Sequence, residues 1–504
     1  MPSSPANSPG IYGGRTSFHV KLPALTSELP PSCDVAIVGA GAAGLATAIF
    51  ARRFNRSCSV VLLDGARAPG AKILVSGGSR CNVTNATVTE RDFWGGTPSA
   101  IRRVLRAFPV SDTIAFFRDI GVTLHEEAGG KLFPDSNRAR DVLAALMRES
   151  ATVGVRLLAG HRVIDVVRLK PDTTKDDAVR RKPDTTEDDA VRRKPDTTED
   201  DAVRRKPDTT EDDAVRRKPD ITELERVGIR NQEGFRIVTE RGEMRAAAVV
   251  LATGGQALPR SGSDGAGFGM ARRLGHTIVP ITPALAPLLL DPAGAMHSIL
   301  SGVSHDAELA VWTDGAVALR LTGSLLWTHF GISGPVALNA SRHWLRAQLD
   351  RRPAAMTLNF RPGMRFDHVD ADWQQRAGAN PRSSVHSTLA SMLPASVADA
   401  ILRATAIDGQ VPLAHLLRAD RRRLARALVE FPLAVTGSRG YTYAEATAGG
   451  ITLSEIDAGT MASRICPGLS CVGEILDVDG RIGGFNFQWA WSSGFVAGRA
   501  LAAI

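Results

Sequence analysis

Residues 33–44 read CDVAIVGAGAAG and place three glycines, Gly39, Gly41 and Gly44, in the pattern GxGxxG. The glycines follow an apolar, β-rich run and precede an apolar stretch with helical spacing. In this arrangement the first glycine allows a tight turn, the second lets the backbone approach a pyrophosphate, and the third lets helix and strand pack closely. The helix N-terminus then offers unpaired N–H groups to the phosphates. The segment therefore predicts a βαβ unit that binds a dinucleotide.

An acidic residue in the expected place supports this prediction. Asp64 ends the apolar run at 59–64, SVVLLD, about 20 residues after the glycines, where the fingerprint needs a carboxylate to hold a ribose. A GxGxxG pattern alone is a weak signal, but here the strand, the helix and the acid are all in register. Residues 34–39 and 59–64 are therefore expected to form neighbouring strands, joined by a helix over 45–53.

Two later segments extend the same site. Residues 251–255 (LATGG) and 471–474 (CVGE) each follow an apolar run with the pattern of a buried strand. Together with the N-terminal fingerprint they resemble the flavoproteins with two dinucleotide-binding domains, in which such segments close around FAD. Residues 265–269 (GAGFG) open a predicted helix, but they lack the preceding strand and the later acid. They are interpreted as a loop-to-helix turn, and no second unit for a nicotinamide is predicted.

The composition is that of an ordinary globular protein, with 504 residues of which 43% are hydrophobic and 23% charged. The five cysteines include no CxxC pair, so neither a zinc ribbon nor a disulfide framework is expected, no metal site is predicted, and a reducing cytoplasm is favoured. No segment is predicted to span a membrane. The net charge of +8 suits a polyanionic substrate, although no basic tract with interleaved aromatics is present.

An internal repeat interrupts the chain. Residues 170–181 read KPDTTKDDAVRR, and the unit KPDTTEDDAVRR then follows three times without change over 182–217. Each unit offers only Ala and Val as apolar side chains, so the repeats are expected to be a disordered insertion in a surface loop. Removal of residues 170–217 is expected to leave the FAD content unchanged.

Longer strings resemble one family. Residues 70–85 (GAKILVSGGSRCNVTN), 328–335 (THFGISGP), 448–451 (AGGI) and 473–494 (GEILDVDGRIGGFNFQWAWSSG) occur in the order typical of the BaiN/YhiN-like NAD(P)/FAD-dependent oxidoreductases. The resemblance covers the chain from about residue 34 to its C-terminus, apart from the repeats.

The resemblance implies an α/β fold class, with a discontinuous Rossmann-like FAD-binding domain that carries an inserted β-barrel-like and helical domain. The FAD-binding domain is expected over 33–280 and 436–504, and the insert over 281–435. Residues 1–32, rich in Pro, Ser and Gly, are expected to form a disordered extension without the pattern of a signal peptide.

The resemblance also implies where the cofactor binds. The glycine turn and Asp64 hold the ADP half of FAD, the 70–85 segment passes near the flavin, and the segment after 473 follows the ribityl chain and reaches the isoalloxazine. The residues expected to bind FAD are Gly39, Gly41, Ala42, Ala43, Gly44, Asp64, Lys72, Ser76, Gly77, Gly78, Arg80, Asn82, Val163, Thr253, Gly254, Gly473, Glu474, Gly484, Phe485 and Asn486.

Two residues are candidates for the catalytic acid. Reduction of a conjugated C=C bond needs a hydride on the electron-poor carbon and a proton on its neighbour. Cys81 lies beside the cation of Arg80, which is expected to lower the thiol pKa, and His329 lies in the THFGISGP string. The alternatives are that Cys81 is a small buried packing residue, that His329 is a satisfied polar group at a turn, and that Arg80 binds either the substrate carbonyl or the FAD phosphates.

The resemblance implies a reductase, with NADH or NADPH as electron donor, that acts on a conjugated C=C bond. A small-molecule enone and a uridine base of ribosomal RNA are both open as substrates, and neither a protein partner nor a membrane is implied. An FAD-dependent amine oxidase that passes electrons to O2 is an alternative. A protein that carries FAD only as a structural element is another.

Overall fold

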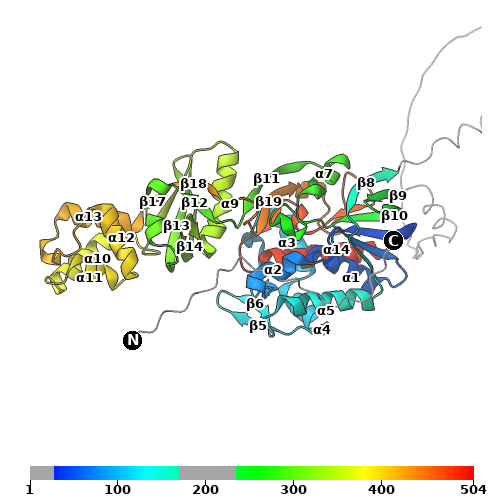
Figure 1. Cartoon of the computed structure of the whole chain (residues 1–504), viewed down its shortest axis with the longest axis horizontal. Coiled ribbons are helices and arrows are strands. Elements are labelled where there is room, and N and C mark those ends of the chain that lie inside the picture. Colours follow the sequence, from blue (N-terminus) through cyan, green and yellow to red (C-terminus); the bar gives the residue numbers. More distant parts are fainter. Residues whose placement is uncertain (1–27, 170–233, 295) are drawn as a thin grey trace, which may run out of the picture. The chain divides into compact units, whose positions relative to one another are not determined.

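The computed structural model describes residues 28–169, 234–294 and 296–504 (Figure 1). Most of the predicted extension and the predicted repeat insertion at 170–217 lie outside the described residues. The described residues up to Val167 and from Phe235 onward form one compact unit. No helix in these ranges is long and apolar enough to cross a membrane.

The central sheet is mostly parallel and confirms the predicted α/β class. Its strands lie in the order β7-β2-β1-β10-β9-β8, and β20 pairs with β10 outside this path. β1 runs parallel to β2 and β10, β2 to β7, and β10 to β20, whereas β9 is antiparallel to β10. The strands are β1 (Ser32–Val38), β2 (Val60–Asp64), β7 (Arg156–Ala159), β8 (Val163–Leu169), β9 (Gly234–Thr239), β10 (Gly242–Leu251) and β20 (Leu469–Cys471). The runs predicted at 34–39 and 59–64 are therefore β1 and β2.

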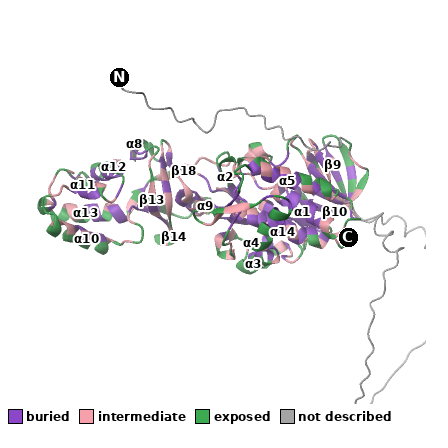
Figure 2. Cartoon of the chain, turned by 90° about the horizontal axis from the view of Figure 1, so that it is seen from below, coloured by how far each residue is buried: buried purple, intermediate pink, exposed green. Residues whose placement is uncertain are grey.

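Two helices from opposite ends of the chain pack together against this sheet. They are α1 (Ala42–Phe54), which follows the glycine turn, and α14 (Phe485–Leu501), and both are largely buried (Figure 2). A Cβ on Gly494 would lie 2.8 Å from Ala46 Cβ, and a Cβ on Gly498 would lie 2.8 Å from Phe50 Cβ. These two glycines, one helical turn apart, allow the helices to approach closely.

Shorter elements surround the sheet. The helices are α2 (Ala71–Ser79), α3 (Pro98–Ala107), α4 (Val110–Asp119), α5 (Ala139–Thr152) and α7 (Ala266–Arg273). The small sheets consist of β3 (Thr84–Asn85), β6 (Lys131–Pro134) and β5 (Leu124–Glu127), and of β4 (Phe93–Gly95) paired with β21 (Val478–Gly480).

The predicted insert contains a second, antiparallel sheet and a group of helices. The sheet has the order β17-β16-β13-β14-β15-β12-β18, and no pairing joins its two end strands in the part of the chain that the structure describes, so it is open. Its strands are β12 (Leu288–Leu290), β13 (Ser304–Thr313), β14 (Ala316–Thr328), β15 (Gly331–Ser333), β16 (Ala354–Asn359), β17 (Phe431–Leu433) and β18 (Val435–Ser438). The helices are α8 (Met296–Ile299), α9 (Pro335–Leu349), α10 (Phe366–Ala379), α11 (Val385–Ala390), α12 (Ala395–Thr405) and α13 (Arg418–Val429).

A two-stranded ladder joins the insert to the rest of the unit. β11 (Ile278–Ala284) precedes the insert and pairs antiparallel with β19 (Ala446–Ile451), which follows it. The register places Ala284 opposite Ala446, so the chain leaves for the insert and returns from it at the same point. The domain boundaries at 280, 281, 435 and 436 stay predictions.

The close packing of α1 and α14 generates a stability prediction. Gly498→Val is expected to lower the free energy of unfolding by about 1–3 kcal/mol, because the new side chain must enter a filled space. Gly378→Ala, at an exposed position of α10 where a Cβ meets nothing within 4 Å, is expected to raise it by about 0.5–1 kcal/mol through helix propensity. Urea denaturation measures both. Equal effects of the two substitutions would contradict the packing argument.

Candidate functional site

A cavity lies at the carboxyl ends of β1, β2 and β10, where parallel strands leave a crevice for ligands. Its wall comes from the loop after β1, the end of β2, the loop after β10, and the short 3-10 helix η7 (Gly473–Ile475). The predicted cofactor residues that line this cavity are Gly39, Gly41, Ala42, Ala43, Asp64, Lys72, Val163, Thr253, Gly254, Gly473, Glu474 and Asn486. Those that do not line it are Gly44, Ser76, Gly77, Gly78, Arg80, Asn82, Gly484 and Phe485.

The three fingerprint glycines differ in what surrounds them. A Cβ on Gly39, whose φ is +104°, would lie 2.5 Å from Ala252 O. A Cβ on Gly44 would lie 1.9 Å from Gly39 O, so α1 can pack on β1 only without a side chain there. A Cβ on Gly41 would meet nothing within 4 Å and would point into open space. This open side at Gly41, next to the N-terminus of α1, fits a pyrophosphate.

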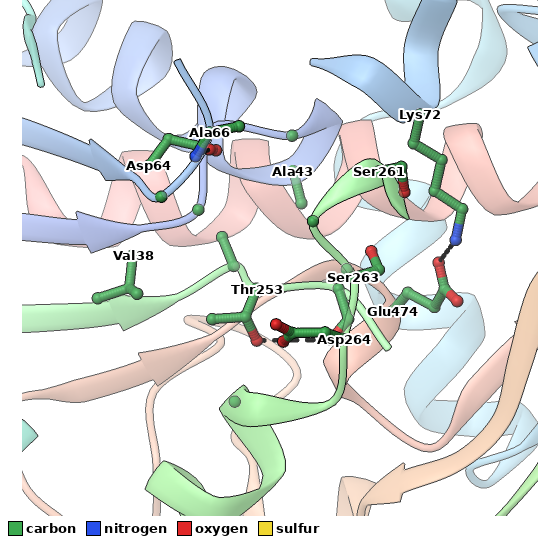
Figure 3. A pocket seen from close by; sticks show the side chains of 18 of the residues that line it. Val38, Ala43, Asp64, Ala66, Lys72, Thr253, Ser261, Ser263, Asp264 and Glu474 are labelled. Atoms are coloured by element: carbon green, nitrogen blue, oxygen red, sulfur yellow. Dashed lines mark hydrogen bonds and ion pairs between the residues drawn. The ribbon is translucent and has the colours of Figure 1, made fainter. Parts of the chain in front are cut away.

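Asp64 joins the glycine turn to the end of β2. Its Oδ2 accepts from Ala40 N at 2.7 Å, and its Oδ1 accepts from Ala66 N at 2.8 Å (Figure 3). Burial raises the pKa of Asp64, whereas these two N–H groups and the nearby Arg162 lower it. Each carboxylate oxygen keeps a second lone pair, so the residue can also accept from ribose hydroxyls. Asp64 is therefore an acceptor that fits the ribose hydroxyls of a dinucleotide.

The other side of the cavity carries an ion pair. Lys72 of α2 pairs with Glu474 of η7, and Figure 3 shows the two side chains reaching toward each other across the site. Glu474 Oε1 also accepts from Thr447 N at 2.9 Å. A Cβ on Gly473 would lie 2.7 Å from Ala43 Cβ, so η7 packs directly on the start of α1. The C-terminal CVGE segment thus closes against the N-terminal fingerprint.

The turn before α14 is held from the inserted part of the chain. Arg342 of α9 donates from Nη2 to Asp479 Oδ1 at 2.8 Å, and its Nε lies 2.6 Å from Asp479 Oδ2. Burial raises the pKa of Asp479 to about 6, and Arg342 opposes that shift. Asn486, which lines the cavity, accepts from Gly480 N at 2.8 Å and donates to Gly480 O at 3.0 Å. The buried ion pair therefore fixes the strand from which this turn starts.

The C-terminal end of α2 and the residues that follow it have a left-handed backbone. Gly77 and Gly78 have φ of 55° and 67°, and Ser79 and Cys81 have φ of 68° and 62°. Such values are costly for residues other than glycine. Asn82 Oδ1 is buried and has no hydrogen-bond partner among the described residues.

The expectation that Arg80 lowers the pKa of Cys81 is wrong. Burial raises the pKa of the Cys81 thiol to about 12, because no solvent reaches the sulfur. Arg80 instead pairs with Glu127 Oε1 at 2.6 Å, and its guanidinium lies 4.0 Å from the centre of the Phe133 ring. Cys81 does not line the cavity, and its catalytic role stays a prediction.

His329 also lies outside the cavity. It occupies the exposed turn between β14 and β15, where its ring lies 5.1 Å from the ring of Phe330. Its role as acid or carbonyl donor stays a prediction, and the structure supplies no contact to the cavity that supports it.

Sequence reasoning missed a polar stretch at the edge of the cavity. Ser261, Ser263 and Asp264 line it, and Asp264 pairs with Arg162 at 2.5 Å. The signal was the string SGSD directly before GAGFG, because a polar loop that leads into a helix N-terminus is a usual ligand wall. The interpretation of GAGFG as a loop-to-helix turn is confirmed, since α7 begins directly after Gly265.

Comparisons with known proteins agree with this geometry. The family model described as HI0933-like protein Rossmann domain matches residues 33–188 and 209–500. The 3-dehydro-bile acid delta(4,6)-reductase of Clostridium scindens is 28% identical over 468 residues, which cover 93% of this chain and 98% of that protein. The ribosomal RNA dihydrouridine synthase of Escherichia coli is 27% identical over 474 residues, which cover 93% of this chain and 98% of that protein.

Solved structures show only a distant likeness. The quinol–fumarate reductase of Escherichia coli has a TM-score of 0.44 at 15% identity, over 94% of this chain and 70% of that one. The 3-ketosteroid delta1-dehydrogenase of Sterolibacterium denitrificans has a TM-score of 0.41 at 12% identity, over 94% and 100%. At these TM-scores the likeness carries no argument about this chain.

The Rossmann-type sheet, the glycine turn and the cavity they form define the class of protein as an FAD-dependent oxidoreductase. Within that class, the chain belongs to the HI0933-like family.

The open side of Gly41 generates a binding prediction. Gly41→Val is expected to keep the stability of the apoprotein, because its Cβ meets no atom, and to weaken FAD binding by at least about tenfold, equivalent to about 1.4 kcal/mol. Titration of the apoprotein with FAD, followed by flavin fluorescence, measures the dissociation constant. Gly44→Ala is the contrasting variant and is expected to destabilise the apoprotein itself. A Gly41→Val protein with wild-type affinity for FAD would contradict the placement of the pyrophosphate.

The buried ion pair generates a pH prediction. Arg342→Met is expected to cost about 3–5 kcal/mol, because it leaves Asp479 buried without its cation. The pKa of Asp479 in the folded state, already above its unfolded value, then rises further. As the pH rises through the folded-state pKa of Asp479, the protonated carboxyl that stabilises the folded variant is lost. The loss of stability relative to wild type is therefore expected to be larger near about pH 8 than near about pH 5. Urea denaturation at both values tests this, and the double variant Arg342→Met/Asp479→Leu is expected to recover most of the loss at either pH.

Proposed function

We propose that this protein is a reductase that adds hydrogen across a C=C bond conjugated with a carbonyl group, with NADH or NADPH as electron donor. The observation that carries the proposal is the shared chemistry of its two kinds of relatives. One is named for reduction of double bonds in an oxidised bile acid, and the other for conversion of uridine to dihydrouridine. A uridine base and an oxo-steroid are unlike in shape, but both present a C=C bond next to a carbonyl.

The residues of the cavity support binding and orientation of FAD. The N-terminus of α1 and the open side of Gly41 suit the pyrophosphate, Asp64 suits the ribose, and the Lys72–Glu474 pair offers both a donor and an acceptor to the polar chain beyond. When bound, FAD supplies two-electron hydride chemistry. The N-terminus of α14, which begins after Gly484, adds a positive helix end near Asn486.

The substrate is the carbonyl-conjugated C=C bond of either a small enone or a uridine base in ribosomal RNA. The net charge of +8 is compatible with attraction to RNA phosphates. The proposal therefore covers both acceptors, and the reaction test below distinguishes them. The cysteine content supports a reducing cytoplasm as the place of action.

The test is an anaerobic titration of the purified holoenzyme with NADH and with NADPH, followed by loss of the oxidised-flavin absorbance. Fast bleaching by one nucleotide is expected. The reduced enzyme is then mixed with cyclohexenone or with transcribed ribosomal RNA, and the return of the oxidised-flavin absorbance is timed against buffer alone. With one of the two acceptors, the oxidised-flavin absorbance is expected to return. Mass spectrometry is then expected to detect a product that is heavier than the acceptor by two hydrogen atoms.

Other outcomes have defined meanings. If neither nucleotide bleaches the flavin, but an amine does so and peroxide forms on admission of air, the protein is an oxidase and the proposal is wrong. If no donor or acceptor changes the redox state of the flavin, FAD is a structural element of the fold.

A further inference from the structure

An acidic residue, Glu445, directly precedes β19. Its backbone N–H donates to Leu285 O at 3.2 Å, which continues the β11–β19 ladder by one residue. Successive side chains of a strand point to opposite faces. Ala446 and Ala448 pack on one face within a small buried cluster. Glu445 and Thr447 therefore share the other face.

The face that Glu445 shares with Thr447 is turned toward the cavity wall. A Cβ on Gly255 would lie 2.4 Å from Thr447 Oγ1 and 3.0 Å from Glu474 Oε1, so Gly255 packs against both side chains, and Thr447 N donates to Glu474 Oε1 at 2.9 Å. Glu474 in turn pairs with Lys72, which lines the cavity (Figure 3). Glu445 precedes Thr447 on the same face, and the charge of Lys72 acts on its carboxyl group.

The carboxylate of Glu445 is accessible and has no hydrogen bond or ion pair within the described residues. The surrounding protein nonetheless desolvates it, which raises its pKa, while Lys72 and Lys131 lower it. These two lysines, from α2 and β6, are the charged groups that act on it from neighbouring elements, and Glu474 partly neutralises Lys72. Glu445 is not itself one of the residues that line the cavity, but Lys72, whose charge acts on it, is one of them.

Lys131, the first residue of β6, brings a cation to the same place. A Cβ on Gly483 would lie 3.8 Å from Lys131 Cγ, so the stem of the lysine packs on the turn before α14. Asn85 Nδ2 holds that turn by donating to Gly483 O at 3.1 Å. α14 begins directly after this turn, and its second residue, Asn486, lines the cavity. Lys131 forms no ion pair within the part of the chain that is described, so its ammonium group is free to bind an oxygen of a ligand.

We propose that Glu445 is the proton donor of the reductase, and that Lys131 binds the carbonyl oxygen of the acceptor. The inference rests on the proposed function. When bound and reduced by the nicotinamide, FAD would supply a hydride to the electron-poor carbon of the acceptor's C=C bond, whose π electrons would then move toward the carbonyl. Lys131 stabilises the negative charge that develops on the oxygen. The O–H bond of Glu445 then breaks, its proton forms the second C–H bond, and the carboxylate regains a proton from water.

The two residues predicted from the sequence as catalytic acids, Cys81 and His329, are less suitable than Glu445. Cys81 is fully buried and its pKa of about 12 makes it a poor acid, and His329 lies on an exposed turn outside the cavity. Glu445 does not line this cavity either, but it is accessible, and the cations of Lys72, on the cavity wall, and of Lys131 act on it.

The first experiment measures proton transfer in a single turnover. Holoenzyme is reduced chemically and mixed anaerobically with cyclohexenone or ribosomal RNA, whichever reoxidises wild type. Glu445→Gln keeps the shape but carries no transferable proton, and it is expected to slow reoxidation by about 10²-fold or more. Glu445→Asp is expected to restore part of the rate. Glu430→Gln, at an exposed glutamate after α13, is the matched control and is expected to behave as wild type.

The second experiment needs no turnover. Holoenzyme is treated with a carbodiimide and an amine over a range of pH, and labelling at Glu445 and Glu430 is read from the same digest by mass spectrometry. Labelling of Glu445 is expected to persist to a higher pH than that of Glu430. Lys131→Met is expected to move the Glu445 midpoint still higher, because it removes a cation that lowers the pKa.

The outcomes separate the two proposals. A wild-type enzyme that neither acceptor reoxidises overturns the proposed function, and the proton donor with it. A wild-type enzyme that is reoxidised, together with Glu445→Gln at the wild-type rate, overturns only the role of Glu445. Equal labelling midpoints for Glu445 and Glu430 would also overturn it, because the acid would then lie in open solvent.

Discussion

The close approach of α1 to the end of β1 is the constraint on which the rest of the structure depends. A Cβ on Gly44 would lie 1.9 Å from Gly39 O, so no other residue permits this contact. The contact aims the first N–H groups of α1 at the crevice between the parallel strands. Around this point the chain gathers three distant segments, because Ala252 packs against Gly39 and Gly44 and the η7 segment packs on Ala43. The cavity thus lies where the packing of α1 on β1 brings these segments together.

The C-terminal part of the chain completes the same site from the other side. α14 lies along α1 through two glycines, and the turn before α14 is held by Asn85, by Asn486 and by the Arg342–Asp479 pair from the insert. A buried ion pair of this kind specifies position more than it adds stability. The insert therefore does more than extend the chain, because one of its helices fixes the strand that leads to the cavity wall.

Local patterns predicted the parts of this fold that local chemistry decides. The glycine turn, the strands on either side of α1, and the acid at the end of β2 follow from spacing and periodicity, and the structure confirms the elements. The raised pKa of the Cys81 thiol could not be predicted from the sequence, because it depends on burial by distant residues and on the pairing of Arg80 with Glu127. The role proposed for Glu445 could not be predicted from the sequence for the same reason. Its neighbours Lys72 and Lys131 lie far away in the sequence, and no motif brings the three together.

The β11–β19 ladder has an evolutionary consequence. The chain enters the insert from β11 and leaves it into β19, and these strands are paired with Ala284 opposite Ala446. The two ends of the insert are therefore held side by side by backbone hydrogen bonds. A change in the length of the insert therefore need not separate its two paired ends, whereas the helix that carries Arg342 must be kept, because Arg342 holds Asp479 in the strand that leads to the cavity wall.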